Sequence, residues 1–526
     1  MKLALHCSVP YDPEIPNAAI GYLKGFLEEN GIVTKNIYWN LILFEDMQFF
    51  TSKLRNSFSE IEQFLNQSSI YILSKLIKSS TYERTVLDAY LKNIFPEHII
   101  SRRLEAIVEK IEAYIDSEKL YDCDVAGFTV NTYQWLSDFT IIKMMKKANP
   151  DLKVLIGGLR TSAQAEEFMK VIKDVDYAIW GEGEYPLLDF LRFLNGKKKE
   201  DDVPNFVYRY GNGLKSTYEI DRKILPSIDS YPFADHSDYY KTLDDLKLEG
   251  LISVIPIWGS RSCFWHKCKF CTITENYPFR ERSPENIIQE IEYQSEKYKI
   301  NRFIFSDSNF AGSNRGRLKK LLKLIHASSY KRKKTYQLWG ELSPLHIDKE
   351  IARLIKLAGF DSVVVGYEAM TDRLLRKMEK MHKFAHNIQT LKLSEEFDIN
   401  TTAALIRGIP TEEESDVIES LHNLRFIRFS LSRYEIITND LTLFKYAPFY
   451  EDVAEEDRNK WNIDMLNNGI EGTGLLKNVD KFEFFGFKSG LTNSYLWEKF
   501  GYLLSKFKEA KFSYNWIGYG SFSVIE

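Results

Sequence analysis

The sequence is poor in cysteine and has no long apolar run. It contains five cysteines in 526 residues, and an odd number of cysteines argues against a disulfide framework and for a reducing compartment. The apolar residues at the N-terminus give way to Tyr11 and Asp12 too soon for a secretory signal, and no apolar run reaches membrane-spanning length. We therefore expect a cytoplasmic protein with no membrane partner.

An excess of charge of one sign is also lacking. The 70 Lys and Arg residues against 74 Asp and Glu residues leave a net charge of −4. This balance gives no general attraction to nucleic acid or anionic lipid, so we expect neither as a partner. The composition is that of a globular protein, and the length predicts two or three domains. Internal repeats and low-complexity tracts are absent from the sequence.

The first 200 residues alternate between short β-rich runs and helical patterns. Five runs read as strands, namely KLALHCSV, VTKNIYW, VAGFTV, KVLIGG and YAIWG. Strands with helical crossovers predict an α/β domain with a doubly wound, Rossmann-like parallel sheet over residues 1–200. A helical insert is expected at about 41–119. The proline-containing stretch at about 201–250 is expected to be a connector.

A second alternation occupies residues 251–440. Its six strand–helix units predict a partial (β/α)6 barrel, in which functional residues lie at the C-terminal ends of the strands. Ser283 and Pro284 mark the start of one helix, Gly359 the end of another, and Thr411 with Glu414 predicts a capping box. Residues 441–526 are expected to form a small C-terminal capping domain.

Three of the five cysteines, Cys263, Cys268 and Cys271, follow the first barrel strand within nine positions. Buried structural cysteines would need apolar neighbours, whereas His266 and lysines lie between them. A zinc site could use His266 as a fourth ligand, but His266 and Cys268 are too close in sequence for easy tetrahedral closure. A 4Fe–4S cluster takes three thiolates on three irons and leaves the fourth iron open for another ligand. The cluster is favoured, and the other two interpretations stay open.

The stretch SRSCFWHKCKFC, with YPFRERSPENIIQEI after it, resembles the cluster segment of radical S-adenosylmethionine (radical SAM) enzymes. The cysteine spacing here is C-x4-C-x2-C, one residue longer in the first gap than the usual C-x3-C-x2-C. The resemblance implies that Cys263, Cys268 and Cys271 are the catalytic cluster ligands. It also implies that the open iron binds SAM, that an electron from the cluster releases a 5′-deoxyadenosyl radical, and that a flavodoxin or ferredoxin supplies electrons.

Later strand ends resemble the SAM-binding stretches of this family. VVGYEAMTDRLLRKMEK matches the family signature whose glutamate faces SAM, with Ala369 in place of the usual serine, and IRGIPTEEESD resembles the stretch beside the adenosyl group. Taken without the resemblance, Glu341 and Glu368 would be solvated strand-end carboxylates. The residues that the resemblance assigns to SAM binding are Ser306, Asp307, Ser308, Glu341, Glu368, Arg407 and Gly408.

Four N-terminal stretches, VPYDPEIPNAAIGYLKGFLEENG, DVAGFTVNTYQW, LIGGLRTS and VDYAIWGEGE, together resemble the cobalamin-binding domain of one large radical SAM class. The family resemblance extends over about residues 1–430. The N-terminal segment lacks both the G-x-G-x-x-G nucleotide fingerprint and the D-x-H-x-x-G cobalt-ligand motif, so the resemblance implies that the dimethylbenzimidazole tail leaves cobalt and enters the sheet crevice. The alternative for its strand-end glycines is ordinary tight turns. The expected cobalamin contacts are Val9, Pro10, Asn131, Thr132, Gly157, Gly158, Gly181, Glu182, Gly183 and Glu184.

The resemblance implies a cobalamin-dependent methyltransferase. Its substrate would be an unactivated sp3 carbon of a peptide or small-molecule natural product, with Tyr446, Phe449 and Tyr450 as candidate substrate contacts. One alternative is a cobalamin-dependent radical SAM enzyme without methyl transfer, performing ring contraction, cyclisation or redox chemistry. Another is a cobalamin- or zinc-binding regulatory protein. Cys7 and Cys123 are expected not to bind the cluster.

Overall fold

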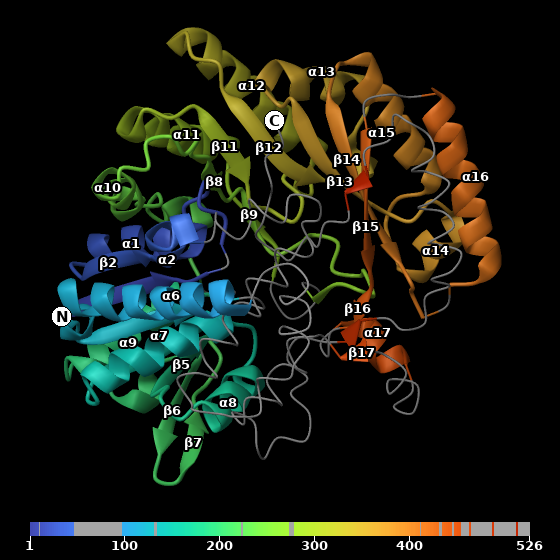
Figure 1. Ribbon diagram of the computed structural model, residues 1–526. Helices are drawn as coiled ribbons and strands as arrows, with labels where there is room; N and C mark the ends of the chain where they lie inside the picture. The colour runs from blue at the N-terminus through green and yellow to red at the C-terminus, as the bar shows by residue number, and fades with distance from the viewer. Residues whose placement is uncertain are drawn as a thin grey trace.

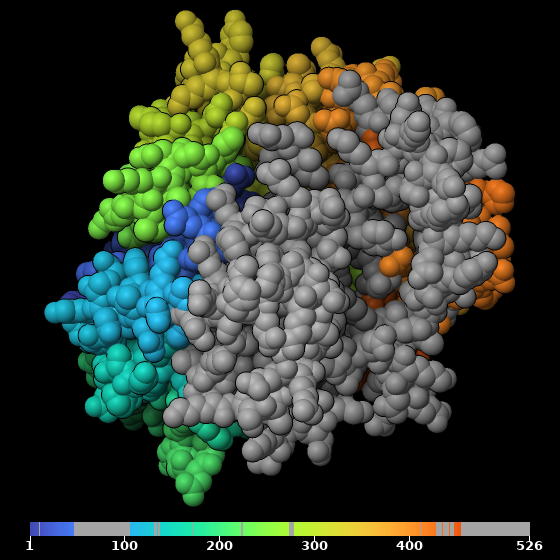
Figure 2. Space-filling model, in the orientation of Figure 1, coloured from blue at the N-terminus to red at the C-terminus, as the bar shows by residue number. Residues whose placement is uncertain are grey.

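The computed structural model describes residues 1–9, 11–46, 97–130, 134–221, 225–272, 278–410, 412–430, 434–443 and 447–453, with short strands at 462–463, 487–488 and 512–513. These residues form two seven-stranded sheets, one after the other along the chain. Figure 1 shows the first sheet with its helices in blue to green and the second in green to orange. In the space-filling view of Figure 2 the two halves occupy different sides of the molecule.

The first sheet has the strand order β2-β1-β3-β4-β5-β6-β7. The strands from β2 to β5 are all parallel. Their bounds are β1 Lys2–Cys7, β2 Val33–Tyr38, β3 Val125–Thr129, β4 Lys153–Leu159 and β5 Tyr177–Trp180. The five predicted strands are therefore confirmed. The strand order reverses between β1 and β3, and the gap at such a switch point is where ligands bind in this type of sheet.

Helices cover both faces of the first sheet (Figure 1). Their bounds are α1 Ala18–Glu29, α2 Trp39–Ile42, α6 Glu97–Ser117, α7 Trp135–Ala148, α8 Ser162–Val171 and α9 Glu184–Leu194. One apolar core takes Ile111, Ile142 and Phe168 from α6, α7 and α8. The core on the other face takes Phe26 from α1 and Phe190 from α9. The doubly wound architecture is confirmed.

Two further strands, β6 Phe206–Tyr210 and β7 Gly213–Ser216, were not predicted and lie in the stretch expected to be a connector. They form an antiparallel hairpin, and β6 pairs with β5 at the edge of the sheet. The sequence did contain a signal for this hairpin. FVYRY alternates as a strand does, and Gly211 in the turn after it adopts a φ of 57°. The same stretch also carries η5 Ile228–Ser230 and α10 Ser237–Asp245.

The second sheet has the order β19-β15-β14-β13-β12-β11-β8 and is parallel throughout. Its strands are β8 Ile255–Ile257, β11 Arg302–Phe305, β12 Gln337–Leu342, β13 Ser362–Glu368, β14 Asn400–Arg407, β15 Tyr434–Asp440 and β19 Phe512–Ser513. The helices between them are α11 Pro284–Tyr298, α12 Arg315–Arg332, α13 Lys349–Ala358, α14 Asp372–Lys377, α15 Phe384–Glu396 and α16 Glu414–Ser430. Because β8 and β19 are edge strands, the described sheet is an open barrel, as predicted.

The predicted helix ends are present where the structure describes them. The Ser283 side chain accepts a hydrogen bond from the Asn286 backbone N–H, with Pro284 in the first turn of α11. Gly359 follows α13 with a φ of 103°, and a Cβ there would lie 2.1 Å from the Tyr336 carbonyl oxygen. Thr411 lies outside the described residues. After the barrel, α17 Pro448–Asp452 and a small sheet of β16 Thr442–Leu443, β17 Asn462–Ile463 and β18 Phe487–Lys488 follow.

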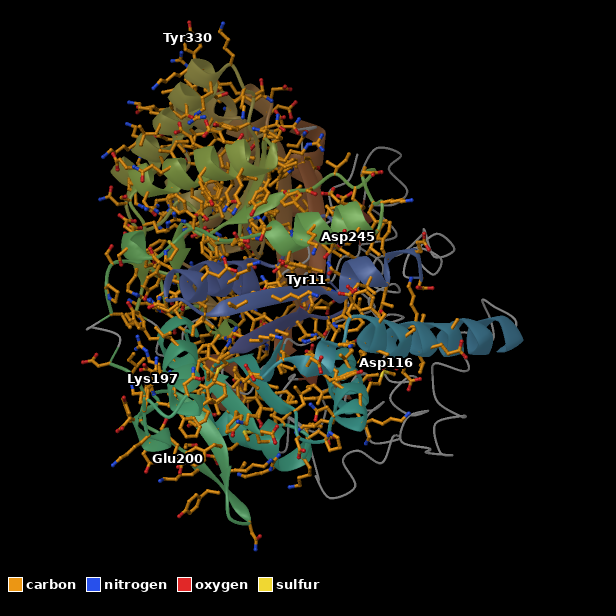
Figure 3. All side chains as sticks on the ribbon, turned by 90° about the vertical axis from the view of Figure 1, so that its left-hand side faces the viewer. Tyr11, Asp116, Lys197, Glu200, Asp245 and Tyr330 are labelled. Carbon is orange, nitrogen blue, oxygen red and sulfur yellow. The ribbon has the colours of Figure 1, made fainter. Side chains whose placement is uncertain are left out.

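A buried polar link joins the two halves. The Tyr22 hydroxyl of α1 donates to Glu290 Oε2 of α11 at 2.9 Å, and Arg282 Nη1 lies 2.5 Å from the same oxygen. The Tyr22 ring stacks on Trp258 with 4.7 Å between ring centroids. Tyr11, which Figure 3 places at the boundary between the halves, packs beside them against an apolar cluster with members from both. These contacts therefore fix the position of one sheet relative to the other.

Within the described ranges, no helix combines the length and the apolar composition needed to cross a membrane.

Candidate functional site

The three cysteines lie on a loop that leaves the barrel after β8 and is closed at its base. The two-residue strands β9 Ser260–Arg261 and β10 Arg280–Glu281 pair antiparallel across this base. Within the loop, Cys268 is buried and Cys263 and Cys271 are half-buried. Closure of the base and burial of the middle cysteine fix the described part of the loop, residues 262–272.

Contacts from the far side of the barrel hold the middle of the loop. The Lys269 backbone N–H donates to the Met378 carbonyl oxygen at 3.0 Å, and the Phe449 N–H donates to the Lys269 carbonyl oxygen at 2.8 Å. The neighbouring Phe270 packs in an apolar cluster that includes Phe449 and Tyr450. Phe449 and Tyr450, two candidate substrate contacts, therefore support the cysteine loop, and Tyr446 lies outside the described residues.

The thiols affect one another electrostatically. Burial raises the pKa of Cys268 to about 12, the Lys380 ammonium opposes this shift, and the neighbouring Cys271 and Cys263 thiols add to it. Among the described residues, no three His, Cys, Asp or Glu side chains converge closely enough to hold one metal ion. A cubane cluster takes each thiolate on a separate iron, so three thiols carried on one short loop suit it.

Asp307 fixes the base of the cysteine loop. This carboxylate, at the end of β11, accepts the Gly259 backbone N–H at 2.8 Å and bonds to the Ser260 hydroxyl. The resemblance assigns Ser306, Asp307 and Ser308 to the methionine part of SAM. In the structure Asp307 is buried with these loop partners, whereas Ser306 is exposed and Ser308 is half-exposed beside it.

Two glutamates from neighbouring strands meet near this loop. Glu341 lies on β12, and Glu368 ends β13 with a φ of 60°, just past a shift of register. An added Cβ on Gly366 would lie 2.8 Å from Glu368 Oε1 and 3.7 Å from Glu341 Oε1. Lys380 Nζ lies 3.0 Å from Glu368 Oε1. The pair and its lysine form a buried charged group beside Cys268. Lys380 was missed from the sequence, although it ends the quoted signature.

Glu341→Gln is expected to remove part of the pH dependence of stability. Burial and the charge of Glu368 raise the pKa of Glu341 from 4.5 to about 8, against the opposing effect of Lys380. The folded protein therefore keeps a proton that the unfolded chain has lost, so the free energy of unfolding falls as the pH rises between these values. Denaturant unfolding of both proteins at about pH 6 and about pH 9 measures the difference. An equal fall in stability for wild type and variant would contradict this assignment.

A cavity of about 340 Å³ joins the strand ends of the first sheet to the cysteine loop. Its lining from the first half includes Gly157, Gly158, Gly181, Glu182, Gly183 and Glu184. Its lining from the second half is Trp258, Arg261, Ser262 and Thr272. Six of the predicted cobalamin contacts are thus gathered at one cavity. Ser262 precedes Cys263 and Thr272 follows Cys271, so the cavity is lined by residues at both ends of the cysteine-bearing segment.

The other predicted contacts lie elsewhere. Val9 is buried in the core of the first half and does not line the cavity. Pro10, Asn131 and Thr132 lie outside the described residues. Gly408 follows β14 with a φ of 74°, and its N–H donates to Glu412 at 3.0 Å. Neither Arg407 nor Gly408 lines the cavity.

Gly157 and Gly158 shape the cavity in different ways. A Cβ added to Gly157 would meet nothing within 4 Å, so this glycine leaves open space beside β4. Gly158 has a φ of 81°, and its Cβ would lie 2.9 Å from the Val130 carbonyl oxygen. The alternative of a tight turn therefore describes Gly158, whereas Gly157 gives room to a ligand.

Charged residues of both halves meet at the rim of the cavity. Arg261 Nη2 lies 2.5 Å from Glu184 Oε1, and Arg280 pairs with Glu182. The Arg261 guanidinium lies over the Trp258 ring, 4.5 Å from its centroid. The Ser262 hydroxyl is buried with no hydrogen-bond partner among the described residues. A glycine-lined cavity with unpaired polar groups at its rim fits a large ligand with polar side arms. The residues that line the cavity thus fit a corrinoid.

Comparison with known proteins identifies the second half. The family model of the Radical SAM superfamily matches residues 260–424. An uncharacterized methyltransferase of Pyrococcus horikoshii is 21% identical over 66% of this chain and 75% of that protein. The anaerobic magnesium-protoporphyrin IX monomethyl ester cyclase of Cereibacter sphaeroides is 21% identical over 71% of this chain, and the chain matches 63% of the cyclase.

Two solved structures share the fold of both halves. The radical S-adenosylmethionine methyltransferase TsrM from Kitasatospora setae, with tryptophan and a SAM analogue bound, superposes with a TM-score of 0.58 at 17% identity, covering 86% of this chain and 76% of TsrM. The cobalamin-dependent S-adenosylmethionine radical enzyme OxsB, with aqua-cobalamin and SAM bound, gives a TM-score of 0.58 at 16% identity, covering 97% of this chain and 61% of OxsB. Residues 260–424 thus match the radical SAM domain, and the chain shares its overall fold with TsrM and OxsB.

Proposed function

We propose that the protein is a cobalamin-dependent radical SAM methyltransferase. The observation that carries the proposal is the single cavity whose walls come from the glycine-rich strand ends of the first sheet and from the cysteine loop of the second. A methyl carrier in this cavity would lie beside a radical source at the loop. Two separate pockets would not place the methyl carrier and the radical source beside the same substrate carbon.

The chain offers distinct residues to each cofactor. Cys263, Cys268 and Cys271 would hold a 4Fe–4S cluster, and Ser306, Ser308, Glu341 and Glu368 would surround SAM. The six glycines and glutamates of the cavity wall would contact cobalamin. When bound, these groups supply a 5′-deoxyadenosyl radical and a transferable methyl group. Glu341 and Glu368 would offer carboxyl oxygens to the amino group of SAM, whose positive charge would favour the ionised form of Glu341.

The substrate class and the electron donor complete the proposal. We propose methylation of an unactivated sp3 carbon in a peptide or small-molecule natural product, with reduction by a flavodoxin or ferredoxin. Methyl transfer is favoured by the methyltransferases TsrM and the Pyrococcus horikoshii protein among the similar chains.

Anaerobic turnover tests this function. With reductant, SAM and a candidate substrate, methyl transfer at a carbon radical is expected to yield S-adenosylhomocysteine and 5′-deoxyadenosine in about equal amounts, because each turnover uses one SAM for each role. Chromatography with mass detection of both products measures the ratio, and trideuteromethyl-SAM should label the product. Purified protein holding zinc in place of about four irons would favour the regulatory alternative.

Ring-forming chemistry is the second candidate, because the similar Cereibacter sphaeroides protein is a cyclase. In that case 5′-deoxyadenosine would form with the substrate, but no substrate-linked S-adenosylhomocysteine and no deuterated product would appear. The same reaction therefore separates the two candidates.

A further inference from the structure

Four charged residues from the two halves meet between the cavity and the cysteine loop. Glu182 and Glu184 follow β5, and Arg261 and Arg280 belong to the paired strands at the base of the loop. Besides its contact with Glu184, Arg261 has Nη1 at 3.8 Å from Glu182 Oε2. The four side chains are 5–16% exposed, so solvent screens their interactions little. We refer to these four residues as the rim cluster.

The rim cluster supports the base of the cysteine loop. Arg261 lies directly opposite Arg280 in the two-residue ladder, and like charges in that relation destabilise a strand pair. Glu182 and Glu184 compensate both cations from the other half of the protein. Since Arg261 is two residues before Cys263, its position also sets where the loop begins.

The rim cluster also faces the cavity. Glu182, Glu184, Arg261 and the adjacent Ser262 all line it. Arg261 Nε and the Ser262 hydroxyl are buried and lack hydrogen-bond partners among the described residues. Buried donors without acceptors are costly, so they point to an acceptor that the chain itself does not supply. Amide carbonyl oxygens, which a corrinoid carries on its side arms, are acceptors of this kind.

We infer that Arg261 and Ser262 hydrogen-bond an amide oxygen of the corrinoid, and that Arg261 thereby couples the position of the corrinoid to the cysteine loop. This inference rests on the proposed function and extends it. Arg261 is a positioning residue in this scheme: Glu184 and the Trp258 ring orient its guanidinium, the corrinoid satisfies its free Nε–H, and the paired strands transmit its position to Cys263.

The test compares two binding events that do not depend on turnover. The first is the dissociation constant of hydroxocobalamin on full-length protein prepared without iron. The second is the electron paramagnetic resonance spectrum of the reduced cluster with and without hydroxocobalamin. The variants are Arg261→Gln, Ser262→Ala and Glu184→Gln. Glu292→Gln is the matched control, because Glu292 pairs with Arg332 at 3.0 Å on the outer helices of the barrel.

Arg261→Gln and Ser262→Ala are each expected to weaken hydroxocobalamin binding roughly tenfold, the effect of one buried hydrogen bond. Hydroxocobalamin should change the cluster spectrum of wild type and of Glu292→Gln, and leave that of Arg261→Gln and Glu184→Gln unchanged. Wild-type affinity in both Arg261→Gln and Ser262→Ala, or an intact spectral response in Arg261→Gln, would overturn the inference. If Arg261→Gln does not fold, the affinity of Ser262→Ala for hydroxocobalamin tests the hydrogen bond. The spectral response of Glu184→Gln to hydroxocobalamin then tests the coupling. Wild-type protein that binds no hydroxocobalamin would instead overturn the proposed function.

Discussion

Replacing Cys268 with alanine is expected to abolish assembly of the iron–sulfur cluster. Cys268 is the buried member of the three thiols, and both Cys263 and Cys271 act on it electrostatically. Iron and sulfide content should fall from about four per chain to near zero, because the cluster cannot be held by two thiolates. Cleavage of SAM should be lost with it. Cys263→Ala and Cys271→Ala should behave alike.

The same variant should still bind hydroxocobalamin, because Cys268 does not line the cavity. Cys123→Ala is the matched control. The Cys123 thiol donates to the Leu120 carbonyl oxygen at 3.2 Å within the first half, far in sequence from the loop. Iron content should stay at the wild-type level. Loss of the cluster in Cys123→Ala, or retention of it in Cys268→Ala, would contradict the ligand assignment.

Gly157→Leu is expected to abolish cobalamin binding and to leave the cluster intact. A Cβ added at this position would meet no neighbour within 4 Å, and Gly157 is not among the glycines with positive φ. The protein should therefore fold normally, while the leucine side chain occupies the cavity that the corrinoid needs. Absorbance titration with hydroxocobalamin measures binding, and iron analysis measures the cluster.

Gly250→Leu provides the control for that experiment. Gly250 likewise has open space around its Cβ and ordinary φ, but it does not line the cavity. Both variants thus add the same apolar side chain to unfilled space, and only one adds it at the proposed site. Normal cobalamin affinity in Gly157→Leu would show that the corrinoid binds elsewhere.

Much of the fold could be predicted from the sequence because its signals are local. Buried parallel strands such as KVLIGG are continuous apolar runs, and the helices between them begin and end at residues such as Ser283 and Gly359. The β6–β7 hairpin was missed because prolines and glycines surround it and its five-residue strand pairs with β5, a contact that no local pattern reveals.

The candidate site was predictable to a similar degree. Gly157 lies near the end of β4, Gly181 and Gly183 follow β5, and all three line the cavity. The rim cluster could not be predicted, because Glu184 and Arg261 are 77 positions apart and belong to different sheets. Asp307 shows the same difficulty, since the resemblance assigned it to SAM binding and no local pattern revealed that its carboxylate also bonds to Gly259 and Ser260. Pairing between distant segments depends on the assembled fold.

The hydrogen bond from Tyr22 to Glu290 has a consequence for how relatives of this protein can be recombined. A chimera that takes its barrel from this protein and its N-terminal half from a relative keeps Glu290 and Arg282. It keeps the hydrogen bond to Glu290 only if the new N-terminal half also has a tyrosine at the position of Tyr22. A carboxylate with no exposure to water that loses one donor is strongly penalised. Chimeras joined between the two sheets should therefore be stable only when α1 and the barrel that it contacts come from the same protein.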